Sequence, residues 1–103
     1  MTTSNEPGYY EDGAFGIRIE NVCITTEAVT PNHFGGRTYV SFETVTVTPI
    51  QTKLVDLALL SDAELKWLNS YNACVRQTLL PVMQIKFPEA VSYLIKETEA
   101  VDK

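Results

Sequence analysis

Two glutamates, Glu6 and Glu20, have the surroundings in this 103-residue chain that most favour chemistry. Each lies in a segment whose neighbours are expected to bury it, and a buried carboxylate is costly unless an arginine or a metal ion lies beside it. A pair of carboxylates on neighbouring strands suits a hard divalent cation such as Mn²⁺ or Mg²⁺. The sequence therefore predicts that Glu6 and Glu20 share a bound cation, and that this chain holds only part of the site.

Arg18 leaves two interpretations of Glu20 open. On a strand, two residues of separation put both side chains on one face, roughly 6 to 7 Å apart. Arg18 and Glu20 could form an internal ion pair that satisfies both groups. Alternatively, Glu20 is a metal ligand whose orientation Arg18 helps to set. Glu6, in a Glu-Pro-Gly turn, could by itself be a solvated residue.

The elements that must position these residues are two strands. Residues 16–26 are rich in β-branched types, and their apolar residues on both faces indicate a central strand. Alternation predicts one face with Arg18, Glu20, Val22 and Ile24, and another with Ile17, Ile19 and Cys23. A polar connection follows, and then a second strand over residues 38–50, which Pro49 ends.

Helical signals fill the second half of the chain. Ser61 and Glu64 have the spacing of a capping box that opens a helix. Pro81 is expected to end or kink that helix, and Pro88 to begin another. The expected core stripes comprise Leu65, Leu68, Val75 and Leu79, and then Val91, Leu94 and Ile95. Strands followed by helices predict the α+β class.

Composition excludes several classes of function. The net charge of −5 and the pI near 4.7 argue against nucleic-acid binding. We expect no secretory signal and no membrane span, and two reduced cysteines of a cytoplasmic protein. His33 is interpreted as a solvated loop residue. No nucleophile-elbow, zincin or phosphate-loop motif occurs.

The motifs E-P-G-Y-Y and R-I-E-N, at this spacing, resemble the C-terminal part of the catalytic domain of cytosolic aminopeptidase P. That family comprises Xaa-Pro aminopeptidases of the pita-bread metallopeptidase superfamily. The resemblance covers nearly the whole chain and is carried by residues 4–10, 16–21, 42–50, 67–71 and 93–98. It implies a partial pita-bread fold, with antiparallel strands in residues 1–50 and two helices in residues 51–103.

The resemblance also implies roles for three residues. Glu6 would bind one metal ion and shuttle protons, Glu20 would bridge two ions, usually Mn²⁺, and Arg18 would support the ligands. The family's remaining ligands, two aspartates and a histidine, lie upstream of the E-P-G motif, so we expect the chain to begin inside a longer sequence and to be inactive alone. Asn72 departs from the family, which commonly has histidine there.

The implied partners are peptides with a penultimate proline and the missing N-terminal part of the same protein. Uncovered strand edges predict a homo-oligomer or a strand-swapped assembly. Two alternatives remain open: a non-catalytic module that acts in oligomerisation or partner binding, and a simple metal buffer.

Overall fold

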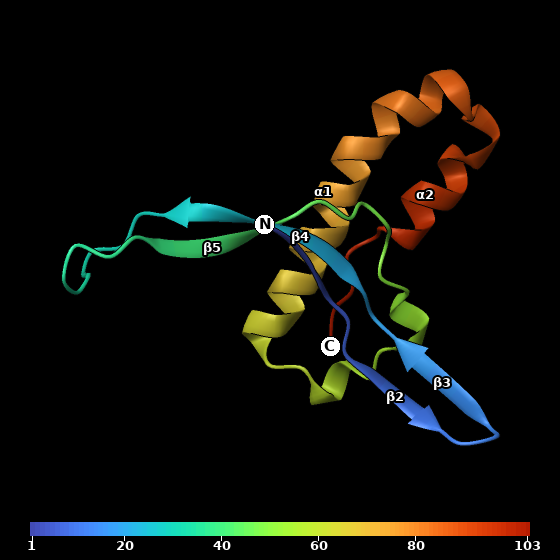
Figure 1. Ribbon diagram of the computed structural model, residues 1–103. Helices are drawn as coiled ribbons and strands as arrows, with labels where there is room; N and C mark the ends of the chain where they lie inside the picture. Colours follow the sequence, from blue (N-terminus) through green and yellow to red (C-terminus); the bar gives the residue numbers. More distant parts are fainter. The chain divides into compact units, whose positions relative to one another are not determined.

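All 103 residues are described in the computed structural model, and they divide into a strand unit, Met1–Thr46, and a helical unit, Val47–Lys103. Strands precede helices along the chain, which confirms the α+β class (Figure 1).

The strand unit contains one sheet and one hairpin. The strands β1 (Thr2–Asn5), β4 (Asn21–Ala28) and β5 (Tyr39–Thr44) form an antiparallel sheet in the order β1-β4-β5. The strands β2 (Gly8–Glu11) and β3 (Phe15–Arg18) pair as an antiparallel hairpin. β4 is the central strand of the sheet, as expected, although only its first part is well buried.

The single strand expected over residues 16–26 is instead two strands, β3 and β4, separated at Ile19 and Glu20. The reason lies in the facing segment, where Pro7 separates β1 from β2. Proline has no N–H to donate to a ladder, so pairing is interrupted on both sides at the same level. One backbone bond remains there, from Ile19 N–H to the Pro7 carbonyl at 3.1 Å.

β5 is shorter than the strand expected over residues 38–50, because it ends at Thr44. Beyond it, Val45 N–H donates to the Val22 carbonyl, and Val22 N–H donates to Thr46 Oγ1 at 2.8 Å. The hydroxyl of Thr46 thus accepts the bond that a backbone carbonyl would accept in a continued ladder, and the chain leaves the sheet at this point.

The capping box is confirmed at the start of α1 (Asp62–Lys86). Glu64 N–H donates to Ser61 Oγ, and Ser61 N–H donates to the Glu64 carboxylate at 2.7 Å. Pro81 lies inside α1 and does not end it. The helix can continue because Pro81 and Gln77, whose backbone carbonyl loses its partner, are both exposed, so water can reach that carbonyl.

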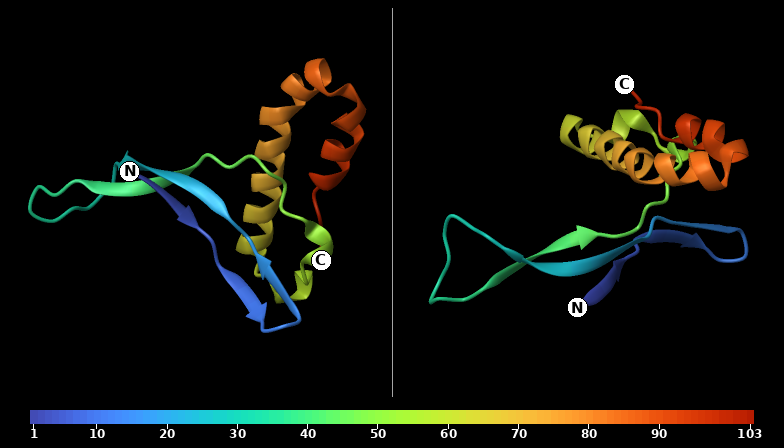
Figure 2. Two further views of the ribbon diagram at one scale, coloured as in Figure 1. Left: turned by 45° about the vertical axis from the view of Figure 1, so that its right-hand side comes forward. Right: turned by 90° about the horizontal axis from the view of Figure 1, so that it is seen from above.

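Short helical turns surround α1. They are η1 (Thr52–Leu54), η2 (Leu57–Leu59) and η3 (Pro88–Ala90), the last leading into α2 (Val91–Glu97). The views of Figure 2 show α1 and α2 lying side by side. Neither helix has the combination of length and hydropathy that a membrane span needs.

The helical core is small. Leu68, Val75 and Leu94 are buried, as expected, whereas Ile95 is 39% exposed, which corrects its expected burial. α2 instead turns Glu97 inward, and the chain following it buries Thr98. Both cysteines of the chain are free thiols.

Polar side chains of α1 hold the irregular segments around it. Asn72, 1% exposed, accepts from Ile50 N–H at 3.0 Å and donates to the Ile50 carbonyl at 3.3 Å. Asn69 makes the same paired contact with the backbone of Val101, and Arg76 donates to Thr98 Oγ1. The bonds of Asn69 and Asn72 satisfy backbone groups of Val101 and Ile50 that no helix or strand partners.

The capping box predicts a pH dependence of helical stability. Hydrogen bonds from Ser61 lower the pKa of Glu64 below its ordinary value of 4.5. A lowered folded-state pKa stabilises the fold above the unfolded-state pKa, and this contribution is lost as the pH falls through the folded-state pKa. Circular dichroism melts should therefore show a smaller acid-induced loss of stability in Glu64→Gln than in the wild type. The change Glu89→Gln, on the same unit, should leave the acid loss as it is; equal melts for all three proteins would contradict the prediction.

The buried amide predicts a large cost for Asn72→Leu. This change leaves both backbone groups of Ile50 without their partner, and we expect it to lower the free energy of unfolding by about 3 kcal/mol. Urea denaturation followed by circular dichroism would measure this. Gln77→Leu, at an exposed position of the same helix, should change the free energy by less than about 0.5 kcal/mol. Similar values for the two variants would show that the paired contact is not stabilising.

Candidate metal centre

Glu6 and Glu20 lie opposite each other at the interruption between the sheet and the hairpin. Asn5 pairs with Asn21 on one side of it, and Gly8 pairs with Arg18 on the other. The register is the same on both sides, so it places Glu6 across from Glu20. The loop after β2 therefore brings together the two acids that the sequence singled out.

Arg18 lies between the two carboxylates. Its Nη2 is 3.3 Å from Glu20 Oε2, and its Nε is 4.0 Å from Glu6 Oε2. Glu6 also accepts a hydrogen bond at 2.7 Å from Ser4 Oγ. The expected sharing of one face by Arg18 and Glu20 is thus met, and within this chain the guanidinium is the cation that both glutamates share.

The expected burial of these acids is wrong for this chain. The side chains of Arg18, Glu6 and Glu20 are 49%, 48% and 43% exposed. Within the strand unit the neighbours of these side chains are β1, β2 and β3, whose residues are themselves almost all exposed and offer no apolar surroundings that would bury a carboxylate. Exposed ion pairs contribute little to stability, so this cluster does not hold the fold together.

Tyr10 belongs to the cluster, and the sequence did not single it out. A hydrogen bond with Tyr10 is the largest of the influences that raise the pKa of Arg18, ahead of the charges of Glu20 and Glu6. Because a guanidinium can only donate, the tyrosine oxygen accepts this bond. Alternation along β2 puts Tyr10 on the face of Gly8, but only the observed pairing of Gly8 with Arg18 shows that this is also the face of Arg18.

The donor set fits part of a site for hard cations. Two carboxylates already converge on one positive charge, and carboxylate oxygens are the ligands that Mn²⁺ and Mg²⁺ prefer. No group of three or more acidic, histidine or cysteine side chains that could hold a metal ion occurs in the chain. His33 lines a hollow together with Glu27 and Arg37, and neither Glu6 nor Glu20 lines that hollow. Glu6 and Glu20 could thus supply two ligands of a larger set.

A protein-family model matches the second part of the chain, beyond the cluster of Glu6, Arg18 and Glu20. The model described as the C-terminal region of peptidase_M24 matches residues 38–101, which is more than half of the chain.

Individual relatives match a larger share of the chain than the family model does. Aminopeptidase P2 of Arabidopsis thaliana is 60% identical over 84 residues, which are 82% of this chain and 12% of that protein. A probable Xaa-Pro aminopeptidase P of Coprinopsis cinerea is 50% identical over 101 residues, 98% of this chain and 16% of that protein. The chain therefore spans only 12% to 16% of the length of these relatives.

A solved structure confirms the fold. The X-prolyl aminopeptidase of Caenorhabditis elegans, described as a cytosolic enzyme with a di-nuclear active site, superposes with a TM-score of 0.83 at 33% identity. The match covers 97% of this chain and 16% of that one, and it confirms a partial pita-bread architecture. With the family-model match, it follows that this chain belongs to the peptidase M24 family, whose C-terminal region it represents.

Proposed function

We propose that this chain forms the C-terminal part of the catalytic domain of an Xaa-Pro aminopeptidase. Such an enzyme is a dinuclear metal-dependent hydrolase that removes the N-terminal residue before a penultimate proline. Residues 1–50 would supply the strand region with the metal-ligand glutamates, and residues 51–103 the helical region. The observation that carries the proposal is the convergence of Glu6 and Glu20 on Arg18 across one strand register.

Each residue of the cluster has a proposed role. Glu6 would bind one metal ion and carry protons during hydrolysis, and Glu20 would bridge two ions. Arg18 would orient both carboxylates, as charged neighbours of metal ligands do. Bound divalent ions, which we propose to be Mn²⁺, would polarise the peptide carbonyl and lower the pKa of the attacking water.

The chain alone is proposed to be inactive as a peptidase. Its two carboxylates are too few to hold two cations that each need about six ligands. The remaining ligands would come from the N-terminal part of the same protein, which is therefore its first proposed partner. The cytoplasm is the proposed location, because both cysteines are free thiols and the C. elegans relative is described as cytosolic.

Self-association is proposed from the sheet. β1 and β5 are the outer strands of the order β1-β4-β5, and Val40 and Phe42 on β5 are 62% and 64% exposed. Unpaired edges with apolar side chains are templates for pairing with another chain. A homo-oligomer or a strand-swapped assembly would cover them.

A chimera tests the proposed activity. The C. elegans enzyme would receive this chain in place of its matching segment, and hydrolysis of an Xaa-Pro peptide would be measured with Mn²⁺. We expect the chimera to be active, the isolated chain to be inactive, and Glu20→Gln in the chimera to lower kcat/KM at least about 100-fold by removing a charged ligand oxygen.

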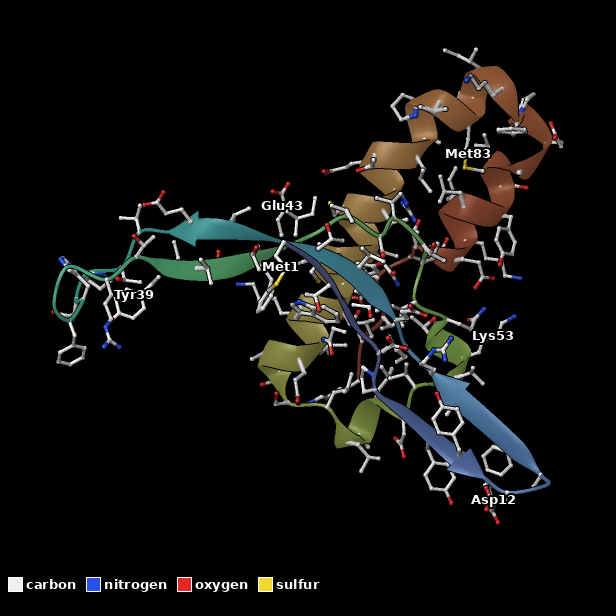
Figure 3. All side chains as sticks on the ribbon, viewed as in Figure 1. Met1, Asp12, Tyr39, Glu43, Lys53 and Met83 are labelled. Carbon is white, nitrogen blue, oxygen red and sulfur yellow. The ribbon has the colours of Figure 1, made fainter.

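The control in that chimera is Glu43→Gln, an exposed glutamate on β5 that Figure 3 labels. It should leave kcat/KM unchanged. A chimera that folds and binds metal ions but does not hydrolyse the peptide would contradict the proposal, as would activity that survives Glu20→Gln. If the graft does not fold in this host, the Coprinopsis cinerea relative offers a host of higher identity.

Light scattering tests the proposed assembly. We expect the 103-residue chain to be a dimer or larger, and Val40→Lys with Phe42→Lys to shift it to a monomer, because charges on an edge strand oppose pairing. Leu59→Lys, a change of the same kind on η2, should leave the assembly intact. A wild-type chain that is a clean monomer would contradict self-association.

A further inference from the structure

The face of the hairpin that carries Arg18 also carries two glycines. Gly8 pairs with Arg18, and Tyr10 pairs with Gly16. Side chains alternate along strands, so these four residues share one face. Tyr10 and Arg18 thus lie on one diagonal of a four-residue patch, and Gly8 and Gly16 lie on the other. The tip of this hairpin is labelled at Asp12 in Figure 3.

The ring of Tyr10 fills the space that the glycines leave. A Cβ atom at Gly16 would lie 2.7 Å from Tyr10 Cδ1 and 3.2 Å from Tyr10 Cε1. A Cβ atom at Gly8 would lie 2.7 Å from the Tyr10 hydroxyl oxygen and 2.9 Å from Tyr10 Cε2. The ring therefore lies across the hairpin over both positions, and its hydroxyl oxygen ends over the residue that pairs with Arg18.

Space, and not backbone conformation, is what requires glycine at these two positions. Neither Gly8 nor Gly16 has a positive φ, whereas Gly13 in the turn does, at 71°. An alanine could adopt the backbone of Gly16, but Tyr10 would have to move. Because Tyr10 is 60% exposed, its ring can swing toward solvent at little cost in stability. A substitution would then displace the ring without unfolding the hairpin.

We propose that Gly8 and Gly16 are positioning residues that form a slot, here named the glycine slot, for the ring of Tyr10. The slot holds the Tyr10 hydroxyl against Arg18 and so fixes the guanidinium between Glu6 and Glu20. Its effect on metal binding rests on the proposed function. Gly16 is the cleaner probe, because an added Cβ at Gly8 would also lie 2.9 Å from the backbone carbonyl of Ile17.

Nuclear magnetic resonance of the 103-residue chain tests the slot without any metal. We expect cross-relaxation between the Tyr10 ring protons and both the Gly16 α-protons and the Arg18 side chain. In Gly16→Ala the contact between Tyr10 and Arg18 should be lost while the strand pairing of the hairpin persists. In Gly13→Asn the contact should remain, because no atom lies within 4 Å of a Cβ there and asparagine tolerates positive φ. A Tyr10–Arg18 contact that survives Gly16→Ala would overturn the slot.

Calorimetric titration of the chimera with Mn²⁺ tests the consequence for the site. Gly16→Ala and Tyr10→Ala should each weaken binding about 10-fold, the lower end for residues that orient metal ligands. Because both act through one ring, the double variant should bind no more weakly than Tyr10→Ala. Effects that multiply in the double variant, or unchanged binding by Gly16→Ala, would overturn the proposal.

The two proposals fail in distinguishable ways. A wild-type chimera that neither binds Mn²⁺ nor hydrolyses the peptide contradicts the proposed function, while the resonance experiment still decides whether the slot exists. A working wild-type chimera with no response to Gly16→Ala contradicts the slot alone.

Discussion

The contact of one guanidinium with two carboxylates is the interaction on which the candidate metal centre of the strand unit depends. Like charges directly opposite each other on paired strands are destabilising, so Glu6 and Glu20 need a cation between them. In this chain Arg18 supplies the charge at 3.3 Å and 4.0 Å. A divalent ion would also need the carboxylates of Glu6 and Glu20 close together. The ion-pair and the metal-ligand interpretations of Glu20 therefore require the same placement of these two side chains.

The helical unit solves a different problem, that of a small core. Only Leu68, Val75 and Leu94 are buried apolar residues there, too few to fix long irregular segments. The carboxamides of Asn69 and Asn72 do this work through paired bonds to Val101 and Ile50. Each carboxamide uses one N–H of its NH2 group as a donor and its carbonyl oxygen as an acceptor, which match a backbone C=O and N–H, so a single side chain replaces a missing strand partner.

Much of this could be predicted from the sequence, because the relevant signals are local. The capping box of Ser61 and Glu64 and the alternation that groups Arg18 with Glu20 need only neighbouring residues. The split between β3 and β4 could not be predicted in this way, since its cause, Pro7, lies in the facing segment between β1 and β2. The burial of Glu6 and Glu20 was predicted wrongly, because it depends on structure beyond the paired strands.

Tyr10 was missed for a related reason: in the pair Tyr9-Tyr10 nothing in the sequence tells which ring lies on the face of Arg18. Only the pairing of Gly8 with Arg18 decides this. Pro81 shows a different error. Proline is a strong local signal for a helix end, but α1 continues through Pro81. The position is exposed, so water can replace the one backbone hydrogen bond that the helix loses there.

The break between β1 and β2 lies opposite the break between β3 and β4. This limits where residues can be added to or removed from the β2–β3 hairpin. Residues added at the turn around Asp12 would lengthen the tip and leave every cross-strand partner in place. One residue added within β2 alone would turn Tyr10 to the opposite side of the ribbon and move Glu6 out of line with Glu20. Length can therefore drift at the tip, whereas the two arms of the hairpin must grow or shrink together.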